Sequence, residues 1–140
     1  MSEGSLELPG EGERLGELLA FLHAFWRSQA LPEGEAFPFE LSLEELFMNV
    51  AMHGTADASS PPQVRVDLHR RGDQVELLFR DRGIPFDPLS LPPPDLTEDV
   101  ETRQVGGLGV FLVREMMDEL EYGFEDGWNC MRIAKRLATG

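Results

Sequence analysis

Basic residues, cysteine and long apolar runs are all scarce in this sequence. Only 12 Lys and Arg stand against 26 Asp and Glu, and this argues against nucleic acid as a direct partner, because phosphate backbones bind clustered cations. The single cysteine, Cys130, excludes an internal disulfide framework and a multi-cysteine zinc site. No positive segment followed by an apolar core begins the chain, and no apolar stretch could span a bilayer. We therefore expect a cytoplasmic protein that does not enter the membrane.

Two kinds of periodicity divide the chain into helices and strands. Hydrophobic residues make up 41% of the 140, enough for one core, so we expect a single domain over residues 1–140. Apolar repeats of three, four and seven predict helices, and alternation of apolar and polar residues predicts strands. The helices are predicted at 11–28, 39–53 and 110–120, and the strands at 5–8, 63–69, 75–80, 119–124 and 128–134. Residues 87–105 are rich in proline and lack periodicity, as functional loops do.

A row of polar residues borders the apolar face of the second predicted helix. Glu45, Asn49 and His53 are spaced four apart, so they form one stripe on a helix. A carboxylate, an amide and an imidazole beside a core face need partners, which are either structural or chemical. The structural alternative for Glu45 is a capping box with Ser42, three residues earlier. We expect His53, at the helix end, to satisfy the last carbonyls rather than act as a base or ligand.

Two further segments carry residues suited to a nucleotide. Asp81 and Gly83 close a predicted strand, where the carboxylate can accept a hydrogen bond from an exocyclic amine, although Asp-x-Gly also forms ordinary turns. Gly106, Gly107 and Gly109 open the third helix, whose free N–H groups and positive end favour an anion such as phosphate. A tightly packed glycine turn is the alternative. No Gly-Lys-Ser/Thr follows, so this segment is not a P-loop.

The order of these three segments resembles the GHKL, or Bergerat-fold, ATPase superfamily. The N box of that family matches Glu45-x3-Asn49, the first glycine box matches Asp81-x-Gly83, and the second matches Gly106-Gly-Leu-Gly109. The loop at 87–105 then corresponds to the ATP lid. The resemblance covers nearly the whole chain. It implies an α/β two-layer sandwich with the histidine-kinase-like ATPase fold, a mixed, mostly antiparallel sheet carrying helices on one face.

Within the superfamily, four stretches are most similar to stand-alone anti-sigma-factor serine kinases: Glu45 to Gly54, Asp81 to Pro88, Gly106 to Arg114, and Met117 to Leu120. This likeness implies an ATP-dependent protein serine/threonine kinase that holds a sigma factor inactive and phosphorylates a STAS-type anti-anti-sigma protein. The acidic charge is compatible with a basic sigma factor, and the family likeness suggests a homodimer. Two alternatives stay open: a nucleotide-binding switch that transfers nothing, and a signalling kinase that binds no sigma factor.

The resemblance also implies a role for each matched residue. Asn49 is similar to the residue that binds the Mg²⁺ bridging the ATP phosphates, a metal that needs few protein ligands. Asp81 is similar to the aspartate that binds the adenine amine, with Gly83 beneath the ring. Glu45 is similar to the base that deprotonates the attacking hydroxyl. The expected ATP-binding residues are Asn49, Asp81, Gly83, Gly106, Gly107, Leu108 and Gly109. The arginines that could neutralise the γ-phosphate are Arg82, Arg103 and Arg114.

Two positions depart from the family pattern. Pro85 stands where the superfamily usually has another glycine, a variation common among the partner-switching kinases. The last strand usually offers a threonine near the adenine, and here the corresponding stretch is Asn129-Cys130-Met131. The nucleotide site is expected to survive the first change, whereas the second leaves the threonine contact open.

Overall fold

One five-stranded sheet and three α-helices make up the described part of the chain, which comprises residues 3–54, 60–90 and 107–138 of the computed structural model, without the side chains of residues 107 and 108. The strands are β1 (Glu3–Pro9), β2 (Gln63–Arg71), β3 (Gln74–Asp81), β4 (Glu119–Glu125) and β5 (Trp128–Arg136). The α-helices are α1 (Leu15–Ser28), α2 (Phe37–His53) and α3 (Gly107–Met116). Short 3-10 turns are η1 (Gly12–Arg14), η2 (Glu33–Glu35) and η3 (Pro88–Ser90).

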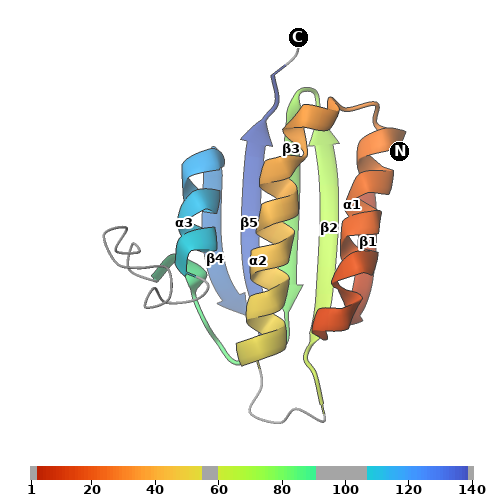
Figure 1. The fold of residues 1–140 in the computed structure, drawn as a ribbon. Coiled ribbons are helices and arrows are strands. Elements are labelled where there is room, and N and C mark those ends of the chain that lie inside the picture. The colour runs from red at the N-terminus through yellow and green to blue at the C-terminus, as the bar shows by residue number, and fades with distance from the viewer. Residues whose placement is uncertain (1–2, 55–59, 91–106, 139–140) are drawn as a thin grey trace.

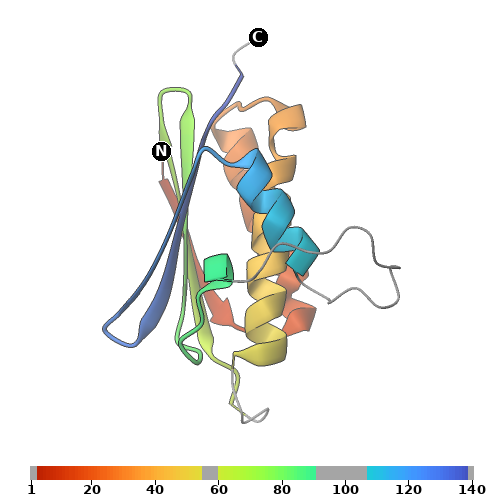
Figure 2. The same cartoon turned by 90° about the vertical axis from the view of Figure 1, so that its left-hand side faces the viewer.

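All three α-helices lie on the same face of the sheet (Figures 1 and 2). The strand order is β1-β2-β3-β5-β4, and the four described pairings are all antiparallel. This confirms the predicted two-layer sandwich, and it makes the described sheet wholly antiparallel where the sequence led us to expect a mostly antiparallel one. None of the described helices is long and apolar enough to cross a membrane.

Tight turns set the register of the two hairpins. Gly72 has φ of +63° between β2 and β3, and Asp126 and Gly127 have φ of +54° and +84° between β4 and β5. Two consecutive positive φ angles twist a hairpin in the direction that its strands twist, which is why Asp-Gly is favoured there. Between the two hairpins, β3 pairs with β5, and Asp81 at the end of β3 lies opposite Asn129 near the start of β5.

The core lies between the helices and the inner face of the sheet. Alternate residues of β2, β3 and β5 point toward the helices, as expected for a sheet covered on one face. α2 runs over the middle of the sheet (Figure 1). Its aromatic residues Phe39 and Phe47 are fully buried, and Phe39 packs on Trp26 of α1 with ring centroids 5.5 Å apart.

Replacing Phe47 with alanine is expected to lower the free energy of unfolding by about 3–5 kcal/mol, because a buried aromatic side chain is removed and its space is only partly refilled. Urea unfolding followed by circular dichroism measures this loss. Phe37 of the same helix is 57% exposed, so Phe37→Ala is the matched control and should change stability by less than about 1 kcal/mol. Equal losses for both variants would contradict the described placement of α2.

Several predicted helix ends differ from the structure. The first helix begins at Leu15 rather than at residue 11, because residues 12–14 form the 3-10 turn η1. α2 begins at Phe37 with Pro38 in its first turn, so Ser42 lies inside the helix and donates its hydroxyl to the Pro38 carbonyl at 2.7 Å. The capping box between Ser42 and Glu45, which was the structural alternative for Glu45, therefore does not form, since Pro38 fits the first turn of a helix and moves its start upstream.

The third helix ends before Leu120, where the periodicity extended it. Its last backbone bond runs from Met117 N to Val113 O at 3.0 Å, and Asp118 N then donates to Ala134 O of β5 at 3.0 Å. The chain thus passes from α3 into the sheet, and Leu120 lies in β4. The apolar side chain of Leu120 fitted both the helical and the strand pattern, because it packs against the same core from a strand.

Candidate functional site

The predicted polar stripe lies on α2. Glu45 and Asn49 are half-buried along this helix and His53 is exposed at its last position. The helix is closed by Gly54, whose N–H donates to Val50 O at 2.8 Å. The four-residue spacing therefore places Glu45 and Asn49 on one side of α2, as predicted, and it aligns them toward the segments that follow.

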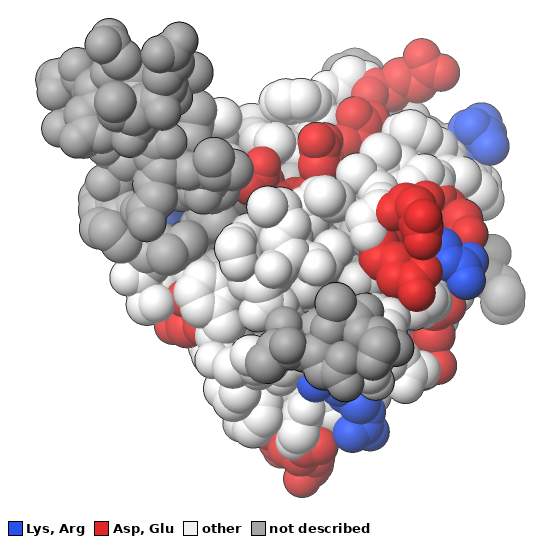
Figure 3. All heavy atoms as spheres, turned by 60° about the horizontal axis from the view of Figure 1, so that its bottom comes forward, with Lys and Arg blue, Asp and Glu red and all other residues white. Residues whose placement is uncertain are grey.

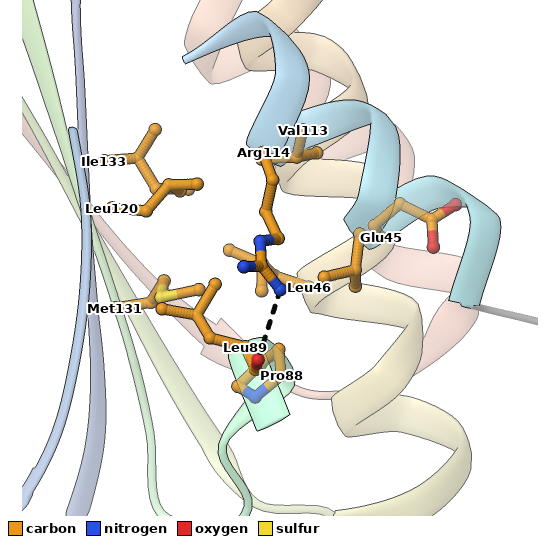
Figure 4. Close-up of a pocket in the computed structure, with 10 residues that line it drawn as sticks. Glu45, Leu46, Pro88, Leu89, Val113, Arg114, Leu120, Met131 and Ile133 are labelled. Atoms are coloured by element: carbon orange, nitrogen blue, oxygen red, sulfur yellow. Dashed lines mark hydrogen bonds between the residues drawn. The ribbon is translucent and has the colours of Figure 1, made fainter. Parts of the chain in front are cut away.

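The first turn of α3 packs directly on Glu45. A Cβ atom built on Gly109 would lie 1.9 Å from Cδ of Glu45 and 2.3 Å from each of its carboxyl oxygens. Only glycine leaves room for this contact, which joins the second glycine segment to the N box. Figure 4 shows the Glu45 carboxyl group directed toward this turn of α3. Burial, and to a smaller extent the charge of Glu44, raises the pKa of Glu45 above its ordinary value.

The end of α2 and the end of β3 are joined through backbone atoms. Ile84 N donates to Gly54 O at 2.8 Å. A Cβ atom on Gly83 would lie 2.7 Å from Gly54 O and 2.9 Å from the Asp81 Oδ1 atom. Gly83 is thus needed for close approach of two backbone segments, and this contact fixes the first glycine box against the N box.

Replacing Gly83 with alanine is expected to destabilise the protein by about 1–3 kcal/mol, because the new methyl group can be accommodated only by moving the Gly54 backbone. Urea unfolding measures this effect. The control is Gly16→Ala in α1, where a Cβ atom would meet nothing within 4 Å. That change should stabilise the helix by about 0.4–1 kcal/mol. A Gly83→Ala variant as stable as the wild type would contradict the described contact.

Asp81 forms the turn that the sequence offered as an alternative, and its carboxylate is held within that turn. Its Oδ1 atom accepts a hydrogen bond from Gly83 N at 2.9 Å and another from Asn129 Nδ2 at 3.0 Å. The residue is buried, with 8% of its surface exposed. Burial raises the pKa of Asp81, and the two hydrogen bonds oppose that rise.

Sequence reasoning treated Asn129 only as a departure from the family's threonine. The structure places its side chain, which is 5% exposed, in contact with Asp81 and with the turn that follows it. A signal was present in the sequence, because a polar residue at an inward position of an alternating strand needs a buried partner. That partner, Asp81, lies in a different strand, so the sequence around Asn129 does not identify it.

Asn49 suits a magnesium ion bound chiefly by phosphate and water. Its Nδ2 atom is buried, and no described residue accepts a hydrogen bond from it. The amide is therefore not held in one orientation by the described protein, and it can offer its oxygen to a ligand. Within 3–54, 60–90 and 107–138, no three His, Cys, Asp or Glu side chains gather to hold a metal. Mg²⁺ often binds through one protein oxygen together with substrate phosphates and water, and this donor set fits such binding.

Several predicted residues fall at the edge of the described structure or beyond it. Gly107 begins α3, the side chain of Leu108 is not described, and Gly106 and Arg103 lie outside the described residues, as does most of the predicted lid at 87–105.

Arg82, one of the arginines expected near the γ-phosphate, is described. Its guanidinium lies over the Trp128 ring, 4.2 Å from the ring centroid.

Arg114 ties α3 to the start of the segment predicted to be the lid. Its Nη1 atom donates to Leu89 O of η3 at 3.3 Å, across an apolar cleft between α2, α3 and the sheet (Figure 4). The cleft is lined by apolar residues that include Leu46, Val113 and Met131, and Asn49 and Asp81 are not among its lining residues. Glu45 and Arg114 also line it, so this cleft adjoins the predicted base but does not reach Asn49 or Asp81.

The sequence matches the family model of the histidine kinase-like ATPase domain over residues 8–135. The chain belongs to this family. That range includes all three segments that meet around α2, and family membership supports ATP as the nucleotide.

Curated relatives share the likeness at modest identity. A Bordetella bronchiseptica protein named serine/threonine-protein kinase BtrW is 28% identical over 102 residues, which is 73% of this chain and 71% of that protein. A Listeria monocytogenes protein named serine-protein kinase RsbW is 34% identical over 92 residues, 63% of this chain and 58% of the kinase. The Staphylococcus aureus protein of the same name is 24% identical over the same length. The chain thus spans little more than half of the RsbW proteins.

Proposed function

We propose that this protein is an ATP-dependent protein serine/threonine kinase that acts as an anti-sigma regulator. The observation that carries the proposal is the contact of the Glu45 carboxyl with Gly109 in the first turn of α3. The first turn of a helix binds phosphate through its free N–H groups. A carboxylate beside that turn is suited to act as the base for a hydroxyl that approaches the terminal phosphate, and this contact supports the proposal.

The transfer step uses Glu45 as the base. Its carboxylate accepts the proton of a serine or threonine hydroxyl, whose oxygen forms a bond to the γ-phosphorus while the bond to the β,γ-bridging oxygen breaks and ADP leaves. A raised pKa makes the ionised carboxylate a stronger proton acceptor, so the burial of Glu45 favours this role. Asn49 would hold Mg²⁺, which supplies neutralisation of the phosphate charge, and Asp81 would accept the adenine amine.

The charge of the protein favours a metal-bound nucleotide and a basic partner. The formal charge is -14, and Figure 3 shows that acidic atoms cover more of the described surface than basic atoms do at the end of the molecule nearest α2's last turn. A free triphosphate would be repelled there, whereas its magnesium complex carries less charge. A sigma factor with a basic binding segment would be attracted by the same surface.

The names of the relatives add support from outside the structure. Similar proteins in Bordetella, Listeria and Staphylococcus are named serine/threonine-protein kinase or serine-protein kinase. We infer from this likeness a STAS-type anti-anti-sigma protein as the substrate and a sigma factor as the second partner, and a homodimer as the assembly.

The test combines binding with phosphotransfer. Calorimetry with Mg²⁺-ATP should show saturable binding, and γ-labelled ATP should transfer label to a STAS-type protein that carries an acceptor serine or threonine. Binding without transfer would favour a nucleotide-dependent switch. Transfer without retention of a sigma factor would favour a signalling kinase of another kind. No binding of Mg²⁺-ATP at all would overturn the nucleotide site itself.

A further inference from the structure

The buried side-chain amide of Asn129, at one end of the sheet, has hydrogen-bond partners for both its nitrogen and its oxygen. It lies near the start of β5, opposite Asp81 of β3 on one side and Phe124 of β4 on the other. Its side chain points toward the helices, as do its inward neighbours along the strand, and is buried. A buried amide is stable only when its donors and acceptor are satisfied, and here they all have partners.

The hydrogen-bond partners of Asn129 allow only one orientation of its amide. Nδ2 donates to Asp81 Oδ1 at 3.0 Å and to Ile84 O at 3.1 Å, with Gly83 O at 3.3 Å. Oδ1 accepts from Phe86 N at 3.0 Å and from the hydroxyl of Tyr122. A carboxylate and two carbonyls can only accept and a backbone N–H can only donate, so a flipped amide would lose these bonds.

This arrangement leaves Asp81 with a single available oxygen. Oδ1 is engaged by Asn129 and by Gly83 N, while no described residue donates to Oδ2. The same amide holds the Gly83–Phe86 turn through three backbone atoms. Asn129 therefore fixes both the rotation of the Asp81 carboxylate and the backbone beside it.

The two purines make different demands on a carboxylate. Adenine presents an exocyclic amine, and one carboxylate oxygen is enough to accept from it. Guanine presents a carbonyl at the equivalent position, which a carboxylate repels, and binds carboxylates through its ring N–H and its own exocyclic amine together. That paired contact needs both oxygens side by side. A carboxylate with one oxygen already engaged can still accept from the adenine amine, but it cannot make the paired contact with guanine.

We propose that Asn129 is a positioning residue that makes the nucleotide site selective for adenine over guanine, by engaging one oxygen of Asp81 and presenting the other alone. The inference rests on the proposed function, since it assumes that Asp81 faces the purine. Without the amide, only Gly83 N holds Oδ1, so the carboxylate can rotate more freely, lose its alignment with adenine and offer its oxygens to guanine. Specificity of this kind comes from rejecting the wrong partner as well as from binding the right one.

The test measures the affinities of Mg²⁺-ATP and Mg²⁺-GTP by calorimetry for the wild type, Asn129→Ala and Tyr122→Phe. For Asn129→Ala we expect the ratio of ATP affinity to GTP affinity to fall by roughly tenfold or more, because a hydrogen bond to a charged group is lost. Tyr122→Phe removes one of the two donors to Asn129 Oδ1 and leaves the fold intact, so it should lower the ratio by a few-fold. Cys130→Ser, next along β5 with its side chain on the opposite face, is the matched control and should leave the ratio unchanged.

The outcomes separate this inference from the function on which it rests. A wild type that binds both nucleotides equally, or a Tyr122→Phe variant and a folded Asn129→Ala variant that both keep the wild-type ratio, would overturn the role of Asn129 and leave the kinase proposal standing. A fall in the ratio of the same size in Cys130→Ser would also overturn it, because the effect would then belong to the strand in general. A wild type that binds neither nucleotide would overturn both proposals. Circular dichroism shows whether each variant is folded.

Discussion

Phosphotransfer by Glu45→Gln is expected to fall by roughly 10²- to 10⁴-fold, the range lost when a general base is removed. Glutamine keeps the size of the side chain and its place against Gly109, but its amide cannot take the hydroxyl proton. The affinity for Mg²⁺-ATP should stay within about twofold, because the base contacts the attacking group rather than the nucleotide. Single-turnover transfer from γ-labelled ATP measures the first quantity and calorimetry the second. Retained transfer would exclude Glu45 as the base.

Glu44→Gln is the matched control for this prediction. Glu44 is the exposed neighbour of Glu45, and its charge is one cause of the raised pKa of Glu45. The base acts only when ionised, so the transfer rate rises with pH through the pKa of Glu45. Removing the neighbouring charge lowers that pKa, and the acid limb of the pH–rate profile should move to lower pH. A shift to higher pH, or a loss as large as that of Glu45→Gln, would contradict this assignment.

Affinity for Mg²⁺-ATP is expected to fall by about 10- to 100-fold in Asp81→Asn, because an amide nitrogen can replace the carboxylate oxygen that faces the adenine amine. Two donors would then face each other. The same amide nitrogen can donate to the carbonyl of guanine, so the variant should lose less affinity for Mg²⁺-GTP than for Mg²⁺-ATP. Calorimetry with both nucleotides measures the two changes.

Asp67→Asn provides the control for a buried aspartate away from the site. Asp67 lies in β2 and is ion-paired with Arg65 and Arg80 at 3.0 and 2.7 Å, with 7% of its surface exposed. Its replacement should lower the stability and leave the ATP affinity unchanged, because Arg65 and Arg80 face the side of the sheet opposite to the inward side chain of Asp81. An equal loss of ATP affinity in both variants would show that Asp81→Asn acts through stability alone.

Most of the fold followed from local pattern. The alternation in residues 63–69 and 75–80, with Gly72 between them, predicted the β2–β3 hairpin, and the structure confirms it. The errors came where one residue fits two patterns. Pro38 and Ser42 both mark helix starts, and the choice between them depends on burial of the first turn, which a sequence does not display.

The candidate site was also predicted from the sequence only in part. Spacing alone placed Glu45 and Asn49 on one side of a helix, and glycine content alone marked Gly83 and Gly109 as places where a ligand could approach the backbone closely. The roles expected for these residues stay proposals, whereas their meeting around α2 is observed. Sequence could not show that Gly109 would pack on the Glu45 carboxyl or Gly83 on the Gly54 carbonyl, since both contacts join elements that are distant along the chain.

By itself, the sequence determined the periodic elements, the acidic charge and the residue types suited to a magnesium nucleotide, because spacing and chemistry are local properties. The tertiary structure decided which of those residues meet, and it decided the part played by Asn129. That amide has one donor group and one acceptor, and only the pairing of β3 with β5, and of β5 with β4, brings Asp81, Tyr122 and the Phe86 backbone to it. A polar residue in a strand predicts a buried partner, but the register of the sheet chooses the partner.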